Sequence, residues 1–343
     1  MKLLSKDSQS NKELIVLESS EGSVEILPLK SGWFQVMLRP IAPERTYVPR
    51  GSCETSLPLS VVASFLQVSF ARLCDSLARH DDPDYVGAVV CNQILAYFDP
   101  PALRGKRLLD FGCGSGASTF WIATMFPETE VVGVELDPMN IRLAREVQAV
   151  RQLPNVQFHV SPDGKRLPPG IGMFDFVMLS AVYEHLLPHE RREVMPLLWS
   201  GLRNGGVLFV NGTPHRYFPY EHHSTGLWFV NYLPDRMTEF LARNFSRKYQ
   251  DLNRSRDWNG HLRGGIRGGT EAEICADLRL AKRGRPIIVQ PKHGDRAGYW
   301  LAATNPDRLR MLKRVIAALF RITDKLWGTV PSMNIDVAIQ KEL

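Results

Sequence analysis

A glycine-rich segment between an apolar run and a helical stretch constrains the fold of this chain more than any other feature. Residues 110–116 read Asp-Phe-Gly-Cys-Gly-Ser-Gly and overlap the end of the apolar run at residues 107–111. Glycines at such a junction permit a tight turn and let the backbone approach a ligand closely. The segment therefore predicts a strand–loop–helix unit of the kind that builds α/β folds.

Downstream of this segment, short apolar runs alternate with helical stretches. The expected strands cover residues 107–111, 131–134, 156–160, 174–179, 207–211, 287–290 and 334–340. One expected helix follows the glycine segment and ends at residue 125, and helical segments after the fourth strand end at residue 202. Further helices are expected over residues 138–150, 235–244 and 306–327. Another begins at a capping box formed by Thr270 and Glu273 and ends at about residue 281. This alternation predicts a Rossmann-like α/β fold, with a mostly parallel seven-stranded sheet and helices on both faces.

The first 100 residues have a different character and predict an N-terminal extension. Short strands are expected at residues 14–17, 24–29 and 33–38, and helices at 57–79 and 85–97. The Pro100-Pro101 pair marks the boundary with the main domain, residues 101–343. Within that domain we expect an insertion at about 212–233 and a basic loop at about 246–269.

Composition excludes several classes of protein. With 44% apolar and 23% charged residues, the chain has enough apolar side chains for a globular core. No apolar stretch approaches the ~18 residues of a membrane span, and residues 1–10 lack the apolar run of a signal peptide. The five cysteines are scattered without metal-ligand spacing. These features favour a reduced, cytoplasmic location.

The net charge of +6 is concentrated in one region. Residues 242–285 contain eleven Lys or Arg and five Asp or Glu. A local basic excess fits an anionic partner, and it also fits a solvated loop. The aromatic-interleaved pattern of an RNA-binding module is absent, so no nucleic-acid partner is expected.

Carboxylates near the glycine segment narrow the choice of ligand. Asp110 ends the first strand, and Glu135 ends the second. A carboxylate beside the glycines would repel a pyrophosphate but suits a cationic ligand, whereas Glu135 is placed to take ribose hydroxyls. The glycine spacing is GxGxG, not the GxGxxG of dinucleotide sites. A nicotinamide-dependent oxidoreductase is therefore an alternative that these residues disfavour.

Four segments, residues 108–116, 132–138, 161–164 and 174–185, together resemble class I S-adenosylmethionine-dependent methyltransferases. The resemblance covers roughly residues 107–233 and is strongest to the type-11 group, which modifies small molecules, lipids and sugars. It implies a Rossmann-like methyltransferase fold, S-adenosyl-L-methionine as cofactor, and an N-terminal extension that covers the cleft as a lid.

The resemblance also implies roles for individual residues. Asp110 would lie near the methionine ammonium, and Glu135 would bind the ribose hydroxyls. Asp163 would reach the adenine amino group, although its Ser-Pro-Asp-Gly setting departs from the Gly-Asp-Ala common in the family. Leu136 would pack on the adenine. The methionine and ribose would be lined by Gly112, Gly114 and Gly116.

The methyl acceptor is expected beyond the fourth and fifth strands. His185, just past the fourth strand, is a candidate general base beside Tyr183, a candidate substrate contact. The insertion adds His215 as a second candidate base and Glu221 and His223 as candidate substrate contacts. The alternatives are a structural histidine at 185 and a well-packed aromatic loop in the insertion.

Metal binding by the insertion is not expected. Glu221, His222 and His223 are ligand types, but adjacent histidines on an extended chain point to opposite faces.

The sequence thus predicts a methyltransferase acting on a small-molecule or lipid- or sugar-linked metabolite, with oxygen as the expected acceptor atom. A non-catalytic cofactor-binding protein of the same fold remains an alternative. Residues 306–327 are apolar on one side and basic on others, which fits a surface helix or a peripheral contact with an anionic membrane. The sequence does not define the acceptor or the oligomeric state.

Overall fold

The central feature of the molecule is a seven-stranded sheet with the strand order β12-β13-β9-β8-β5-β6-β7. The computed structural model describes residues 14–43, 46–246, 258–304 and 310–342. The strands from β7 to β9 pair in parallel, and β13 runs antiparallel to both of its neighbours. Their bounds are β5 Arg107–Phe111, β6 Glu130–Glu135, β7 Val156–Val160, β8 Phe174–Ser180, β9 Leu202–Pro214, β12 Arg285–Ile288 and β13 Asn334–Glu342. The predicted mostly parallel sheet is confirmed.

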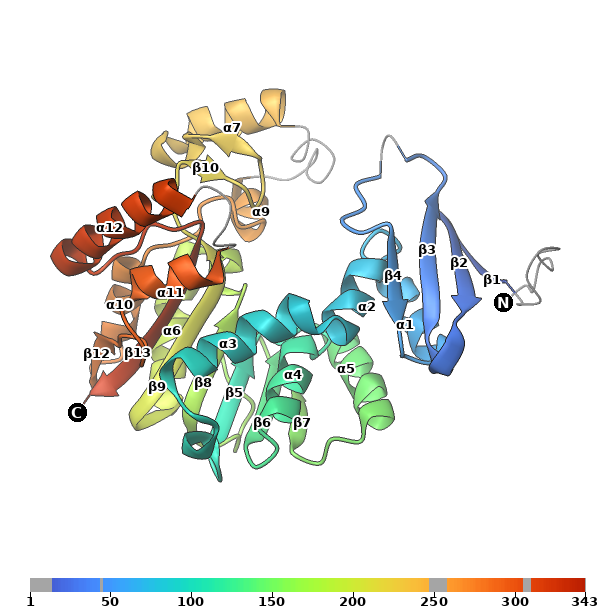
Figure 1. Ribbon diagram of the computed structural model, residues 1–343, viewed down its shortest axis with the longest axis horizontal. Coiled ribbons are helices and arrows are strands. Elements are labelled where there is room, and N and C mark those ends of the chain that lie inside the picture. The colour runs from blue at the N-terminus through green and yellow to red at the C-terminus, as the bar shows by residue number, and fades with distance from the viewer. Residues whose placement is uncertain (1–13, 44–45, 247–257, 305–309, 343) are drawn as a thin grey trace.

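Helices cover both faces of this sheet (Figure 1). Because side chains alternate along a strand, Leu108 joins one apolar core and Leu109 the other. The first core also takes residues from α3 Ala88–Tyr97, α4 Ala117–Met125 and α5 Pro138–Arg151. The second takes residues from α6 Pro188–Gly201 and α10 Glu271–Arg279.

Helix α3 belongs to the covering of the large sheet, although its residues were predicted within the extension. The Gln93 side chain is buried and its Nε2 donates to the backbone oxygens of Val210 and Val337, at 3.1 and 3.2 Å. The Asn211 amide donates to Gln93 Oε1 at 2.7 Å. A buried amide with these partners ties α3 to β9 and β13.

The N-terminal extension is a four-stranded antiparallel sheet with two helices. It contains β1 Ile15–Ser19, β2 Gly22–Pro28, β3 Phe34–Pro40, β4 Ser52–Thr55, α1 Leu59–Val68 and α2 Leu73–Asp81. In Figure 1 it lies to one side of the large sheet, and α2 and α3 lead from one to the other. Strand β4 was not predicted.

The single helix predicted over residues 57–79 is wrong, because the chain breaks between α1 and α2. Ser69 has an extended backbone, with φ −163° and ψ 119°. Its hydroxyl accepts a hydrogen bond from the Arg72 N–H at 3.3 Å. Phe70 is buried against Gly22, where a side chain would collide with its ring. Burial of this aromatic ring outweighs the continuous helical pattern.

The C-terminal part adds elements that the sequence pattern did not predict. The insertion forms a short hairpin, β10 Tyr220–Glu221 and β11 Leu227–Trp228, before α7 Asp235–Phe245. The basic loop predicted at about 246–269 contains the helix α9 Trp258–Arg263, and its residues 247–257 lie outside the described ranges. Helix α11 Arg296–Ala303 precedes α12 Arg310–Trp327. Among the helices described, none is long and apolar enough to cross a membrane.

The predicted capping box at the start of α10 is half formed. The Thr270 hydroxyl accepts from the Glu273 N–H at 3.2 Å. The Glu273 carboxylate, however, pairs with Arg216 of the insertion and does not return to the Thr270 backbone. The helix start therefore also anchors the chain that follows β9.

Candidate active site

A cleft lies where the parallel strands end, as expected for an open α/β sheet. It encloses about 410 Å³ and is lined from both sides by the loops after β5, β6, β7 and β8. Its lining includes Gly112, Glu135, Leu136, Asp163, Ala181, Val182, His185 and Arg263. Three predicted cofactor residues beside Gly112, namely Glu135, Leu136 and Asp163, thus meet in one cavity.

Two glycines of the loop are required by their surroundings. Gly112 has φ +75°, and a Cβ there would lie 2.7 Å from a methyl group of Val182. Gly116 has φ +88°, and a Cβ there would lie 2.7 Å from the Phe158 ring. Residues other than glycine rarely adopt a backbone with positive φ. Gly116 therefore serves the packing of β7 against the loop, while Gly112 borders the cleft.

Asp110 acts from beneath the loop. Its side chain is buried, and its Oδ2 accepts from the hydroxyls of Ser118 and Thr119 at 2.6 and 2.7 Å. Burial raises the pKa of this carboxyl above its usual value. Asp110 does not line the cleft. It joins β5 to the first turn of α4, so its effect on a ligand would pass through the backbone that it fixes.

Glu135 organises the mouth of the cleft. Its Oε2 accepts from the Gly114 N–H at 3.0 Å, and its Oε1 accepts from the N–H groups of Leu136 and Asp137 at 2.7 and 3.0 Å. Each carboxylate oxygen can accept two hydrogen bonds. The group thus fixes both adjacent loops and keeps some capacity for hydroxyl donors in the cleft.

Leu136 and Asp163 form the far wall. The Leu136 side chain is 53% exposed although it lines the cavity, and it contacts the turn at Gly164. Asp163 accepts from the Lys165 N–H at 3.0 Å and from Arg166 at 2.7 Å, and the first of these bonds leads in lowering the pKa of its carboxyl. An exposed apolar side chain beside a carboxylate suits a flat, polar-edged ring.

A second cavity, of about 700 Å³, adjoins the cleft and shares Ala181, His185 and Arg263 with it. Its other walls come from the N-terminal extension, from the insertion and from the residue that follows α9. They are Tyr47, Pro49, Arg72, Asp75, Ser76, Arg79, Tyr85, His222, His223, Ser224 and Gly264. Ala181, between the two cavities, has φ +54°, which strains a residue with a Cβ. Strain of this kind clusters at functional sites.

His185 stands at the junction of the two cavities. Its Nδ1 lies 2.6 Å from the backbone oxygen of Arg263. A carbonyl oxygen only accepts, so Nδ1 carries the proton and Nε2 of the neutral ring carries a lone pair. The ring of His223 lies beside it, with centroids 5.4 Å apart. Of the predicted bases, His185 is the one that faces open space.

Three other residues predicted to contact the methyl acceptor are buried and bound to neighbouring groups of the protein. Tyr183 is buried, donates to Asp277 at 3.0 Å, and lies under the Arg191 guanidinium. His215 is buried, with Nε2 3.0 Å from a carboxylate oxygen of Glu271. Glu221 is buried and accepts from the N–H groups of three residues. These are His223, Ser224 and Thr225. Their enclosure gives Tyr183, His215 and Glu221 structural roles in place of the predicted contacts.

Sequence reasoning expected the extension to cover the cleft but named none of its residues as part of the site. His80 of α2 is buried, and its Nε2 lies 3.0 Å from the Ser115 hydroxyl in the glycine loop. Arg72 and Arg79 line the second cavity. No motif marks these residues, because their role depends on docking of α2 against α4.

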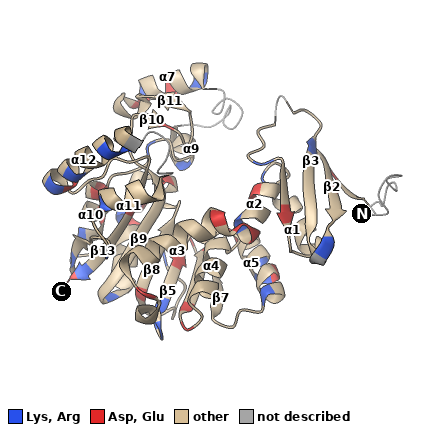
Figure 2. Ribbon diagram, in the orientation of Figure 1, with Lys and Arg blue, Asp and Glu red and all other residues tan. Residues whose placement is uncertain are grey.

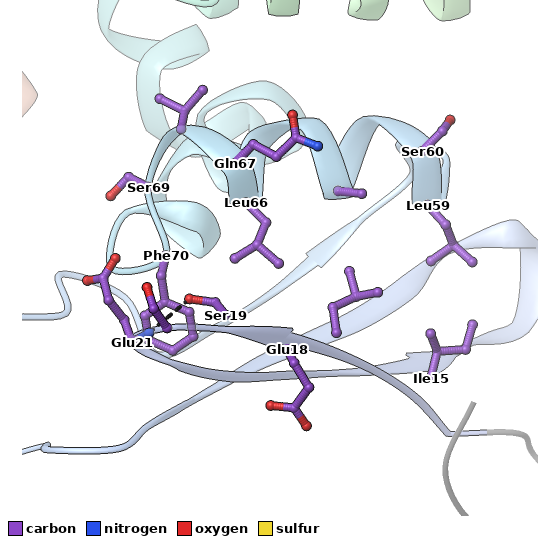
Figure 3. Close-up of a pocket in the computed structure, with 14 residues that line it drawn as sticks. Ile15, Glu18, Ser19, Glu21, Leu59, Ser60, Leu66, Gln67, Ser69 and Phe70 are labelled. Carbon is purple, nitrogen blue, oxygen red and sulfur yellow. Dashed lines mark hydrogen bonds between the residues drawn. The ribbon is translucent and has the colours of Figure 1, made fainter. Parts of the chain in front are cut away.

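A further cavity of about 770 Å³ lies between β1 and α1 in the extension (Figure 3). Its lining mixes apolar side chains such as Ile15, Leu59 and Leu66 with polar ones such as Glu18 and Glu21. None of the predicted site residues lines it, so we assign it no part in the site.

Comparison with known proteins identifies similarities in the part of the chain that forms the cleft. Residues 108–206 match the family model described as a methyltransferase domain. A trans-aconitate 2-methyltransferase of Deinococcus radiodurans is 36% identical over 30% of this chain and 36% of its own length. A phthiotriol/phenolphthiotriol dimycocerosates methyltransferase of Mycobacterium leprae is 27% identical over 42% of this chain and 49% of its own.

Among solved structures, an amino pentose methyltransferase from Micromonospora echinaspora is 33% identical over 38% of this chain and 50% of its own, with a TM-score of 0.29. The chain spans about half or less of the curated relatives named above. The fold and cleft define an α/β domain of the Rossmann-like class. Residues 108–206 thus form a methyltransferase domain, and the solved relative named above is described as bound to S-adenosylmethionine.

Proposed function

We propose that this protein transfers the methyl group of S-adenosylmethionine to an oxygen of a small or lipid- or sugar-linked acceptor that carries negative charge. The observation that carries the proposal is the junction of two cavities at His185. One cavity is lined by four of the predicted cofactor residues, and the other is lined by residues of both the extension and the insertion. An acceptor in the second cavity would meet the cofactor at this junction.

The cleft residues suit the cofactor. Glu135 offers carboxylate oxygens for ribose hydroxyls, and the exposed Leu136 offers an apolar surface for the adenine. Asp163 lies where the adenine amino group is expected. The bound cofactor supplies a methyl group already activated by a sulfonium. The protein's main task is therefore alignment of the acceptor and exclusion of water.

Charge in the second cavity favours an anionic acceptor. Among the residues that the structure describes, Arg72, Arg79 and Arg263 line it together with one carboxylate, Asp75. Asp75 pairs with Arg79 at 2.9 Å, and Arg263 pairs with Glu190. The relatives are named for acceptors as different as trans-aconitate and a lipid, so the argument rests on this chain's own cavity.

His185 is the proposed base. Its Nε2 would take the proton of an acceptor hydroxyl as the oxygen forms its bond to the methyl carbon and the carbon–sulfur bond breaks. The Arg263 backbone oxygen holds the ring in the tautomer that this step needs. An acceptor carboxylate would require no base, and His185 would then only border the reacting group.

Peripheral contact with an anionic membrane through α12 is a further part of this proposal. Five side chains on one face of the helix, Met311, Val315, Leu319, Ile322 and Leu326, are 53–75% exposed. Figure 2 shows Lys and Arg along the same helix. An apolar face beside basic residues is typical of helices that lie on anionic lipid. Such a contact would suit a lipid-linked acceptor at the cytoplasmic side.

Calorimetric binding of S-adenosylmethionine and S-adenosylhomocysteine tests the cofactor. We expect micromolar binding that is lost in Glu135→Ala, because both flanking loops lose their acceptor. Glu130→Ala is the matched control, since Glu130 is a carboxylate at the other end of β6 and pairs with Arg107. No binding by folded wild-type protein would overturn the proposal. Binding without methyl transfer to anionic metabolites or lipids would favour a non-catalytic cofactor-binding protein.

A further inference from the structure

Three side chains of types that can bind metals, two of them neighbours in sequence and the third in the insertion, meet beside the cleft. Glu184 and His185 follow β8, and His223 comes from the insertion. One donor atom from each lies within 4.8 Å of the others. Donors on one tetrahedral zinc ion lie about 3.4 Å apart, given zinc–ligand bonds of about 2.1 Å. Small side-chain rotations would therefore bring all three onto one ion.

Glu184 supplies an independent sign of a missing partner. Its side chain is fully buried, and its Oε2 accepts from the Thr213 hydroxyl at 2.7 Å. Its Oε1 has no hydrogen-bond partner within the described residues and points toward Nε2 of His185, 3.8 Å away. A buried carboxylate oxygen without a donor is costly, and a cation at this point would remove the cost.

His185 is already in the form that binds metal. Its Nδ1–H donates to the Arg263 backbone oxygen at 2.6 Å, which leaves the lone pair on Nε2 facing Glu184. Metal-ligating histidines typically donate their second ring N–H in this way, because the bond fixes the tautomer and the ring orientation.

The insertion fixes the third ligand. The His223 N–H donates to Glu221 at 2.9 Å, so the buried Glu221 carboxylate sets the backbone at this residue. Gly265 provides the space for the ring, since a Cβ there would lie 2.8 Å from Nε2 of His223. The expectation against a metal concerned His222 and His223 together. The structure instead joins His223 alone to a pair from another loop.

We propose that Glu184, His185 and His223 bind a divalent first-row transition ion, such as zinc, beside the second cavity, in which we place the acceptor. Two imidazoles and one carboxylate suit such ions better than magnesium or calcium, which prefer oxygen ligands. Three protein ligands leave coordination positions for the acceptor. His185 and His223 both line that cavity.

The role of the ion, but not its binding, rests on the proposed methyl transfer. An ion at this site would polarise an acceptor hydroxyl or hold an acceptor carboxylate close to the cofactor cleft. His185 would then act as a ligand of the ion and would not be the base. The two roles of His185, as a general base and as a metal ligand, can be distinguished by whether methyl transfer depends on a transition metal.

The test is titration of chelator-treated, full-length protein with Zn²⁺ by calorimetry, and with Co²⁺ by visible absorption. We expect one ion per chain at micromolar affinity and Co²⁺ bands typical of nitrogen and oxygen ligands. Glu184→Gln keeps the shape of the buried side chain, and His223→Ala removes the ligand from the insertion. Each should weaken binding by at least about tenfold. His222→Ala, which removes the neighbouring histidine of the same cavity, should leave metal affinity unchanged.

Binding of S-adenosylhomocysteine is measured on the same preparations, so that failure of the metal site and failure of the cofactor site are separated. Circular dichroism melts report whether each variant folds. Absence of a stoichiometric Zn²⁺ or Co²⁺ site in protein that binds S-adenosylhomocysteine would overturn the metal proposal alone. The proposal would also be overturned if folded Glu184→Gln and His223→Ala bound the metal as tightly as the wild-type protein does.

Discussion

Asp110 and Glu135 each lie near the end of a parallel strand, but the Asp110 side chain is buried whereas the Glu135 side chain lines the cleft. Asp110 points into the protein and binds two hydroxyls of α4. Glu135 lines the cleft and binds the backbone of both adjacent loops. The sequence places both carboxylates near a ligand, but it does not reveal which one is buried. That difference depends on Ser118 and Thr119, which face Asp110 once α4 has formed.

Asp110→Ala should therefore lower the free energy of unfolding, and it should affect cofactor binding only through the loop that Asp110 fixes. Loss of the carboxylate leaves the buried hydroxyls of Ser118 and Thr119 without their acceptor. We expect the free energy of unfolding to fall by about 1–3 kcal/mol, measured by urea denaturation. Unchanged stability together with abolished binding of S-adenosylhomocysteine would instead assign Asp110 to direct ligand contact.

His80 should make stability depend on pH. Burial, followed by the charges of Arg151 and Arg79, lowers the pKa of its ring to about 3 in the folded protein. An unfolded histidine titrates near pH 6.5, so below that pH the unfolded state binds a proton that the folded state excludes. Stability is then lost progressively as the pH falls from about 6.5 toward about 3. The loss at pH 5 should be about 2 kcal/mol.

Urea unfolding of wild type and His80→Gln at pH 7 and pH 5 measures this effect. Glutamine does not titrate, so the variant should lose less stability than wild type over the same interval. Parallel pH dependence in the two proteins would show that His80 is not excluded from protonation in the folded state.

At the level of elements, the strands of the large sheet were predictable and the breaks were not. β5 and β7 have the predicted bounds, because continuous apolar runs mark strands buried on both faces. The break between α1 and α2 depends on burial of Phe70 against β2, a contact distant in sequence. The site divides in the same way. The glycine loop and Glu135 were predictable, whereas the cluster of Glu184 with His223 depends on how the insertion folds back.

Helix α12 leads to a prediction about membranes. Its buried side, with Ala317 and Phe320, packs on α11, while its exposed apolar face carries Leu319. Leu319→Glu should lower binding to phosphatidylglycerol vesicles by about tenfold or more, since a buried leucine contributes about 1.5–3 kcal/mol. Cosedimentation measures this binding. Val150→Glu, at an exposed apolar position of α5, is the control.

Phosphatidylcholine vesicles separate the two contributions in that experiment. We expect the protein to bind phosphatidylcholine vesicles more weakly than anionic vesicles, because α12 carries basic residues. Each basic residue near an anionic surface adds about 1 kcal/mol to the binding free energy. If wild-type protein binds neither kind of vesicle, α12 has no membrane role.

At the scale of the whole molecule, one apolar core joins the extension to the main domain. Val24 and Phe65 of the extension belong to the same cluster of buried side chains as Phe120 and Phe209. We expect a single calorimetric unfolding transition, with equal calorimetric and van't Hoff enthalpies. Two separate transitions would mean that the extension folds independently of the sheet.

The contact between His80 and Ser115 has a consequence for the affinities of the two ligands that the site would bind. It joins α2, which forms part of one wall of the second cavity, to the glycine loop after β5. If an acceptor shifts α2, the affinity for the cofactor changes by some factor, and the cofactor must change the affinity for the acceptor by the same factor. The N-terminal extension would thus make the two ligands thermodynamically linked, so that each one bound reports on the other.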